Sequence, residues 1–264
     1  MTQKQLIILL LFITGLGGQV RAATPEKTKT ITLAIDPWYP WVIPKQGATS
    51  GGGVNFIKEL YRRLGFDVDI SLYPFKRVLS HLETGNVDSS WLMTKNASRQ
   101  QYALFSEAFL SEPFYIYSAA RTGAAFEWHH WQDLKNHSLG LSSGFYYGQA
   151  FHYAAKTYDF KTHEVKTDFQ LIKMLLGGRL DLIILNQTVA QAMLRDFPEF
   201  HGRLHQASKA VIDTRYYILL SKKSPHKALL PKINDTIKAM KEDGSIQRLL
   251  KGAQPLSNTA PGHE

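Results

Sequence analysis

Hydrophobic and polar residues follow two periods along this chain, one typical of β-strands and one typical of helices, and segments of the two kinds alternate. Continuous or alternating apolar runs predict β-strands at residues 30–35, 66–72, 87–93, 113–120, 138–141, 180–185 and 216–221. Apolar residues three and four positions apart predict helices at residues 54–64, 75–82, 145–158, 169–176, 188–195 and 229–251. The last helix is predicted to be interrupted near Asp243 and Gly244. Strands that alternate with helices predict an α/β protein with mostly parallel sheets.

One arrangement occurs twice in the sequence. An apolar helix, a glycine, one polar residue, one apolar residue and an aspartate precede a strand at GNVD, residues 85–88, and again at GRLD, residues 178–181. Gly85 is expected to end its helix, because that position favours a residue with positive φ. Two such copies indicate two lobes built alike rather than one continuous sheet. Ligands of such proteins bind beyond the carboxyl ends of strands and between domains.

The N-terminus predicts a secretory signal peptide over residues 1–23. Lys4 supplies a positive charge, residues 6–16 are an apolar run too short to span a bilayer comfortably, and Ala22 and Ala23 offer a cleavage site. An uncleaved anchor is the alternative, and the short apolar run argues against it. The sequence contains no cysteine, which excludes disulfides, thiolate metal sites and a lipid-modified cysteine. These features favour a protein of the bacterial periplasm.

Charge and histidine content exclude two classes of function. The formal net charge is +9, but the basic residues are scattered and no basic run is interleaved with aromatic residues, so we do not expect nucleic-acid binding. His129 and His130 are adjacent and their side chains diverge. His201 and His205 have helical spacing, but Gly202 weakens the helix they would need. We expect no metal site, and no motif predicts a cofactor.

Five segments follow one another in an informative order. They are DPWYPW (36–41), VNFIKELYRRLGF (54–66), GNVDSSWLMTKNASRQQYALFSEAF (85–109), GRLD (178–181) and KAMKEDGSIQRLL (238–250). Together they resemble the periplasmic solute-binding proteins of amino-acid-type ABC transporters, which have the type II periplasmic-binding fold (bacterial extracellular solute-binding proteins, family 3). The resemblance implies an α/β fold with two lobes, each a mostly parallel sheet flanked by helices, and a ligand cleft between them.

The resemblance also implies where the chain passes between lobes. The crossings are expected near residues 118–121 and 213–217. Lobe 1 would then comprise residues 24–118 and 214–264, and lobe 2 residues 119–213.

Three residues acquire binding roles from the resemblance. Arg99 stands where the family has the arginine that binds the ligand's α-carboxylate, and a guanidinium offers two parallel donors that fit a carboxylate. The alternative is a surface ion pair with an acid such as Glu107. Thr94 matches a hydroxyl that donates to the same carboxylate, or is an ordinary residue at a strand end. Asp36 matches an acid that can face a ligand ammonium, or caps the turn before Pro37.

The chain departs from the family pattern at other positions of the expected cleft. Asn186 stands where many amino-acid binders have an aspartate for the ligand ammonium, and an amide cannot supply that charge. The other departures are large aromatic residues, which can stack on a flat or cationic ligand or belong to the core. They are Trp38, Tyr39, Trp41, Trp91, Phe145, Tyr146 and Tyr147.

The predicted function is capture of a small polar solute, an amino acid or related carboxylate, by closure of the two lobes. The predicted partners are the carboxylate-bearing ligand and an inner-membrane permease or receptor, with the protein itself a monomer. A periplasmic sensor role is not distinguished from transport. Two enzyme alternatives remain: a hydrolase using the G-x-S-x-G pattern at residues 140–144, and a dehydratase of cyclic carboxylic acids on the same fold, with Asp36 as general acid. Catalysis is not the expected function.

Overall fold

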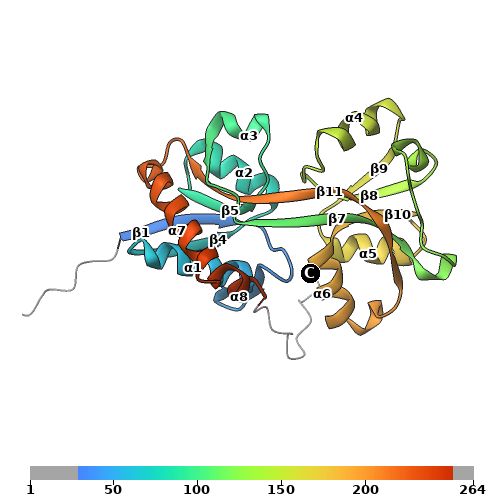
Figure 1. Ribbon diagram of the computed structural model, residues 1–264, viewed down its shortest axis with the longest axis horizontal. Helices are drawn as coiled ribbons and strands as arrows, with labels where there is room; N and C mark the ends of the chain where they lie inside the picture. Colours follow the sequence, from blue (N-terminus) through green and yellow to red (C-terminus); the bar gives the residue numbers. More distant parts are fainter. Residues whose placement is uncertain (1–28, 252–264) are drawn as a thin grey trace, which may run out of the picture.

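The alternating strands and helices of the sequence form two α/β lobes in the computed structural model, which describes residues 29–251 (Figure 1). The predicted signal peptide, residues 1–23, lies outside the described residues, as does the C-terminal end. None of the helices in this described part has the length and apolar composition needed to cross a membrane.

Lobe 1 has a sheet in the order β4-β1-β5-β11, with β6 also pairing β11. Its strands are β1 (Lys29–Ile35), β4 (Phe66–Leu72), β5 (Ser89–Met93) and β6 (Ala103–Phe105). Its helices are α1 (Gly52–Arg63), α2 (Phe75–Thr84), α3 (Ala97–Tyr102), α7 (Leu230–Glu242) and α8 (Ser245–Lys251). A small hairpin, β2 (Ile43–Lys45) and β3 (Ala48–Ser50), precedes α1. Strand β1 is parallel to both β4 and β5.

Lobe 2 continues the order as β11-β7-β10-β8-β9. Its own strands are β8 (Ser138–Ser142), β9 (Lys161–Val165) and β10 (Leu182–Asn186), with β8 parallel to both of its neighbours. Its helices are α4 (Gln149–Thr157), α5 (Asp168–Leu176) and α6 (Gln187–Asp196). Short 3₁₀ turns lie at Ala120–Thr122, Trp131–Leu134, Pro198–Phe200 and, in lobe 1, Lys227–Leu229.

Two long antiparallel strands join the lobes. Strands β7 (Leu110–Ala119) and β11 (Leu204–Ser221) run side by side across the middle of the molecule (Figure 1). Strand β11 pairs with β7 as far as Tyr216 and with β5 from Tyr217. Strand β7 pairs with β10 of lobe 2 over Phe114–Tyr117. These two strands form the connection between the lobes.

The repeated sequence motif makes the same contacts in both lobes. The carboxylate of Asp88 accepts hydrogen bonds from the Thr32 backbone N–H at 2.9 Å and hydroxyl at 2.8 Å. The carboxylate of Asp181 accepts hydrogen bonds from the Ser138 backbone N–H and hydroxyl, both at 2.8 Å. Each aspartate therefore fastens the strand that follows it to the first strand of its own lobe. Gly85 ends α2 with φ 81°, as predicted.

The core follows the predicted periods. Every residue of β5 and β10 is buried, as expected for strands covered on both faces. The buried face of α1 consists of Val54, Phe56, Ile57, Leu60 and Tyr61, at helical spacing.

Helix α4 and strand β11 begin elsewhere than predicted, and strand β9 was missed. Helix α4 begins at Gln149 rather than residue 145, because Gly144 and Gly148 adopt φ values of 79° and 88° and keep the intervening residues in a loop. Strand β9 was missed because four of its five residues are exposed and carry no apolar pattern. Strand β11 begins at Leu204, not residue 216, and places His205 on a strand.

Candidate functional site

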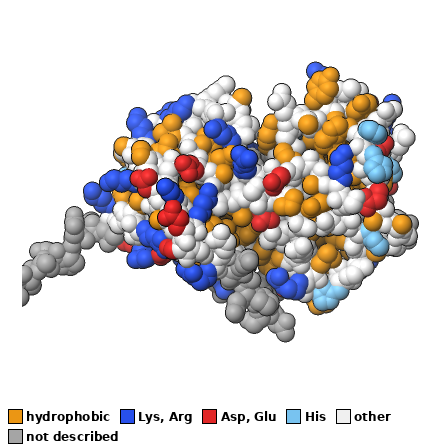
Figure 2. All heavy atoms as spheres, in the orientation of Figure 1, with side chains coloured by type: hydrophobic (Ala, Val, Ile, Leu, Met, Phe, Trp, Pro, Cys, Tyr) orange, Lys and Arg blue, Asp and Glu red, His pale blue; other side chains and the backbone are white. Residues whose placement is uncertain are grey.

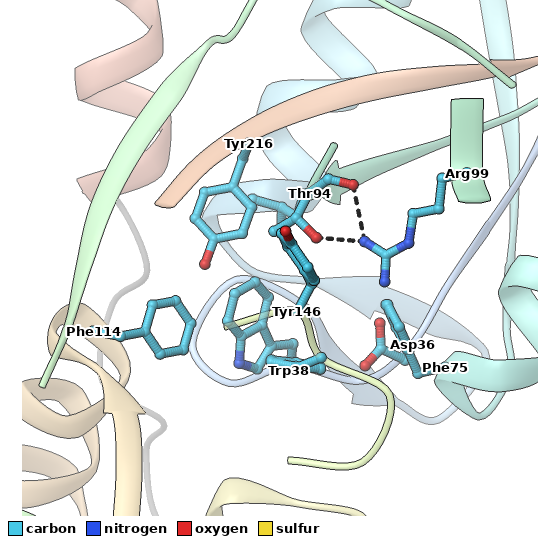
Figure 3. Close-up of a pocket in the computed structure, with 10 residues that line it drawn as sticks. Asp36, Trp38, Phe75, Thr94, Arg99, Phe114, Tyr146 and Tyr216 are labelled. Carbon is cyan, nitrogen blue, oxygen red and sulfur yellow. Dashed lines mark hydrogen bonds between the residues drawn. The ribbon is translucent and has the colours of Figure 1, made fainter. Parts of the chain in front are cut away.

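A pocket lies where the two lobes face each other, and the surface is hollowed along their junction (Figure 2). Its empty volume is about 340 Å³, part of which is open solvent. Six of the ten residues predicted for the site line it, together with four others. The lining residues are Asp36, Trp38, Phe75, Leu92, Thr94, Arg99, Phe114, Phe145, Tyr146 and Tyr216 (Figure 3).

Arg99 is held in the pocket by the start of α3. Asn96 caps this helix by accepting a hydrogen bond from the Arg99 backbone N–H at 2.8 Å. The guanidinium turns back and donates through Nη1 to the carbonyl oxygen of Thr94 at 2.9 Å and to the Thr94 hydroxyl. Nη2 donates across the cleft to the Gly144 carbonyl at 3.3 Å. The guanidinium carbon lies 5.2 Å from the centre of the Phe75 ring, a cation–π contact.

The Arg99 guanidinium forms no salt bridge with an acid of the described chain. Its side chain is buried, with 4% of the residue exposed. Within residues 29–251 no carboxylate oxygen lies within 4.0 Å of it, and the predicted alternative, an ion pair with Glu107, does not form. Burial lowers the pKa of Arg99 from its usual value. A buried cation without a counter-charge is unfavourable, so the pocket favours an anionic ligand group.

Asp36 follows β1 and faces the same space as Arg99 (Figure 3). Burial raises the pKa of its carboxyl to about 7. The hydrogen bond from its own backbone N–H opposes that rise, Asp168 adds to it, and Arg99 opposes it. The charge of this end of the pocket therefore changes near neutral pH, from the Arg99 cation alone at low pH to a balanced pair at high pH.

Trp38 crosses from lobe 1 into lobe 2. Its indole N–H donates to the carboxylate of Asp168 at 2.9 Å, and the hydroxyl of Ser142 donates to the same carboxylate at 2.6 Å. Asp168 is the first residue of α5 and is 8% exposed. Burial raises its pKa, while the hydrogen bonds from Ser142 and Trp38 oppose that rise. The ring of Trp38 contacts Phe145 at 5.4 Å and Tyr216 at 5.6 Å between centroids.

The other four predicted residues lie outside the pocket lining. The Tyr39 hydroxyl forms a hydrogen bond to the carboxylate of Asp196 across the lobes. Trp41 and Trp91 are buried in the core. Asn186 caps α6 by accepting a hydrogen bond from Val189 N–H at 3.1 Å, and is also buried.

Four lining residues and one residue behind them were not predicted. Phe114 and Tyr216 belong to the two connecting strands, where apolar residues look like core. Phe75 begins a helix, and Leu92 stands inside a strand. Asp168 resembles an ordinary acidic residue of a first helical turn. Only Leu92 is conformationally unusual, with φ 56°, and no sequence signal indicates it.

Two chemical alternatives find no support in the geometry. The central serine of the G-x-S-x-G pattern is Ser142, whose hydroxyl donates to the carboxylate of Asp168 rather than to a histidine. No group of three or more His, Cys, Asp or Glu residues within residues 29–251 could hold a metal ion.

Comparison with known proteins assigns the family. Residues 31–252 match the bacterial extracellular solute-binding proteins, family 3. The arginine-binding extracellular protein ArtP of Bacillus subtilis (strain 168) is 22% identical over 240 residues, covering 90% of this chain and 91% of that protein. The chain belongs to the family 3 solute-binding proteins, whose members bind solutes rather than convert them.

Solved structures share the fold. An ancestral arginine-binding protein bound to arginine has a TM-score of 0.72 at 21% identity and covers 84% of this chain and 96% of that chain. The GluR0 ligand-binding core from Nostoc punctiforme in complex with L-glutamate has a TM-score of 0.67 at 18% identity, with coverage of 84% and 96%. The two-lobed α/β fold predicted from the sequence is confirmed.

Proposed function

We propose that this protein captures a carboxylate-bearing solute, an amino acid or a related acid, with the ligand carboxylate on the Arg99 guanidinium. The observation that carries the proposal is the buried Arg99 cation, which faces the pocket and forms no salt bridge within residues 29–251. Thr94 fixes the guanidinium through two hydrogen bonds to Nη1, and Phe75 supports its face. The remaining guanidinium nitrogen points to the opposite lobe, where a ligand would lie between the two surfaces.

The rest of the ligand would contact aromatic rings. Trp38, Phe145 and Tyr146 were predicted for this role, and Phe75, Phe114 and Tyr216 extend the same wall. Such a pocket suits a ligand with a flat, apolar or cationic remainder. Similar proteins named for arginine or solved with glutamate support an amino acid or related acid as the ligand class.

Ligand capture would proceed by closure of the lobes about β7 and β11. Contacts between the lobes already surround the pocket: Trp38 with Asp168, Tyr39 with Asp196, and Arg99 with Gly144. A ligand that contacts both lobes would stabilise the closed state by its preference for that state. We retain the proposed lobe limits, residues 24–118 with 214–264 and residues 119–213.

We further propose a periplasmic location after removal of residues 1–23, a monomeric state, and delivery of the ligand to an inner-membrane permease. The match to an extracellular solute-binding family supports function outside the cytoplasm. A sensor role, in which the closed form contacts a receptor, is the second candidate. It is favoured by the similarity to the ligand-binding core of GluR0.

Calorimetric titration with a panel of acids, amino acids and polyamines tests the binding site. We expect a carboxylate ligand to bind the unaltered protein and to lose about a hundredfold in affinity in Arg99→Met, because a charge-paired, desolvated contact is removed. Arg77→Met, which removes an exposed arginine of the same lobe, is the control. Thr94→Val should weaken the same ligand less. Carboxylate binding that survives Arg99→Met in a folded protein would refute the proposed site.

A further inference from the structure

Two buried side-chain groups that can donate hydrogen bonds lie at the end of the pocket away from Arg99, and no acceptor in the described chain takes the hydrogen of the Tyr216 hydroxyl. They are the hydroxyl of Tyr216 and the side-chain amide nitrogen of Asn186, on residues 2% and 1% exposed. Neither atom has a hydrogen-bond partner within 3.5 Å in the described chain, but the Asn186 side chain acts on the Tyr216 hydroxyl as a hydrogen-bond donor and so lowers the Tyr216 pKa. Asn186 pairs in the sheet with Phe114, and both Phe114 and Tyr216 line the pocket. Tyr216 therefore faces the cavity, and Asn186 lies behind the lining, next to Phe114 in the sheet.

The orientation of the Asn186 amide is fixed by α6. Its oxygen accepts the hydrogen bond from Val189 N–H at 3.1 Å and caps the helix. Only an oxygen can fill that role, so the NH₂ group is the part that faces Tyr216. Asn186 thus offers Tyr216 a donor and no acceptor, which leaves the hydrogen of the Tyr216 hydroxyl for a ligand to accept.

Tyr216 is also a donor at physiological pH. Burial raises the pKa of its hydroxyl well above the usual value, Glu112 adds to the rise, and the hydrogen bond from Asn186 opposes it. The hydroxyl therefore keeps its proton. It points into the space between Trp38 and Phe114, on the opposite side of the pocket from Arg99 (Figure 3).

Unpaired buried donors are costly, and a ligand that supplies an acceptor removes that cost. An ammonium group has donors only and cannot do so. A second carboxylate would be repelled, since the acids Glu112 and Asp168 both act on Tyr216. A neutral carbonyl or hydroxyl oxygen meets both conditions.

We propose that the Tyr216–Asn186 end of the pocket binds an uncharged oxygen of the ligand. The solute is then a carboxylic acid that carries a carbonyl or hydroxyl oxygen and places no ammonium at this position. Tyr216 and Asn186 determine this specificity. The inference rests on the proposed function, because Arg99 must hold the carboxylate at the other end.

Matched ligands that differ in one substituent test the inference. One set is phenylpyruvate, phenyllactate, phenylalanine and 3-phenylpropanoate, and a second is the oxo, hydroxy, amino and unsubstituted forms of pentanoate. We expect the oxo or hydroxy acid of at least one set to bind on the order of tenfold more tightly than its amino and unsubstituted counterparts in calorimetry, as one satisfied buried donor implies.

Two variants assign the preference to residues. In Tyr216→Phe the oxo, hydroxy and unsubstituted acids should bind with nearly equal affinity. The unsubstituted acid should still bind, because the ring is kept. Asn186→Asp keeps the cap on α6 and replaces the donor by an acceptor, so it should shift preference toward the amino acid. Tyr217→Phe, on the neighbouring and partly exposed ring, is the control.

The outcomes separate the inference from the proposed function. An amino acid that binds through Arg99 as tightly as its oxo and hydroxy counterparts overturns the inference alone. Equal binding of all four acids of each set, unchanged in Tyr216→Phe, also overturns it and leaves water as the partner of the donors. Binding of no acid, or binding unaffected by Arg99→Met, overturns the proposed function and this inference with it.

Discussion

The two lobes share a framework, but the groups that follow the ends of their strands differ in chemistry. In each lobe an aspartate of the repeated motif fastens its strand to the first strand of the lobe, through Asp88 in lobe 1 and Asp181 in lobe 2. Beyond those strands, lobe 1 presents the charged groups Asp36 and Arg99 to the pocket. Lobe 2 presents a backbone carbonyl, aromatic rings and the buried carboxylate of Asp168. The framework therefore sets where a side chain lies, while the residues beyond the strand set what it binds.

The largest predicted effect is a difference in stability between substitutions in the two copies of the repeated motif. Asp88 also accepts a hydrogen bond from the Ser224 hydroxyl at 2.6 Å, whereas within residues 29–251 the Asp181 carboxylate accepts hydrogen bonds from Ser138 alone. We expect Asp88→Ala to lower the free energy of unfolding by about 2–3 kcal/mol and Asp181→Ala by about 1 kcal/mol. Denaturant unfolding measures both, with the exposed Asp235→Ala as control. Equal losses would contradict the ranking.

The pKa values of Asp88 and Asp181 predict how the stability of the protein depends on pH. Burial acts to raise the pKa of Asp88, but hydrogen bonds from Ser224 and Thr32 outweigh it, and hydrogen bonds from Ser138 lower the pKa of Asp181. Both folded pKa values therefore lie below the unfolded value of about 4. Their stabilisation is present above that pH and is lost as the pH falls through the folded values. Unfolding curves between pH 7 and the acid range should converge for the wild type and Asp88→Ala.

Asp36 should behave in the opposite way. Its folded pKa of about 7 exceeds the unfolded value, so the folded state binds the extra proton and stability falls as the pH rises from about 4 to 7. Asp36→Asn should then be more stable than the wild type at pH 8, by about 2 kcal/mol after allowance for partial exposure. At pH 4 the difference should vanish. A destabilised Asp36→Asn at pH 8 would contradict the assignment.

We expect the proposed closure of the lobes to depend more on Trp38 than on the other contacts of lobe 1. Trp38→Phe keeps a ring but removes the hydrogen bond to Asp168, which leaves a buried carboxylate short of one donor. We expect a larger radius of gyration in small-angle scattering without ligand and about tenfold weaker ligand binding. Trp131→Phe, within lobe 2, is the control. An unchanged radius would show that the lobes close without this contact.

The smallest predicted effect concerns the outer contact between the lobes. The Tyr39 hydroxyl meets Asp196, which is also paired with the exposed side chain of Arg195. Because Asp196 keeps this second partner, Tyr39→Phe should weaken ligand binding only about twofold. If Tyr39→Phe weakened ligand binding as much as Trp38→Phe, the main contact that closes the lobes would be Tyr39–Asp196, at the rim of the cleft, rather than Trp38–Asp168.

Much of the framework could be predicted from the sequence, because local patterns determine it. Strand β4 has the predicted limits, and the break between α7 and α8 falls at Asp243 and Gly244 as expected. Strand β9 and the first half of β11 escaped prediction because mostly exposed or partly buried residues form them. Their partners across the sheet, rather than their own sequence, make them strands.

The pocket was predictable only where one residue carries a recognisable role. Arg99, Thr94 and Asp36 came from the family resemblance, and all three line the pocket. Asp168 and Tyr216 were missed because their importance arises from burial and from the apposition of two lobes, which no local pattern encodes. The aromatic segment after β1 illustrates the limit: Trp38 lines the pocket, whereas Trp41, three residues later, belongs to the core.

The path of β11 has a consequence for the order of assembly. Its last residues pair with both β5 and β6, in the interior of the lobe 1 sheet, and they follow all of lobe 2 in the sequence. During synthesis, which proceeds from the N-terminus, every strand that belongs to lobe 2 alone is available before lobe 1 receives this interior strand. The lobe that begins the polypeptide is thus the last to be completed, and the arginine it contributes acquires its final surroundings only at the end.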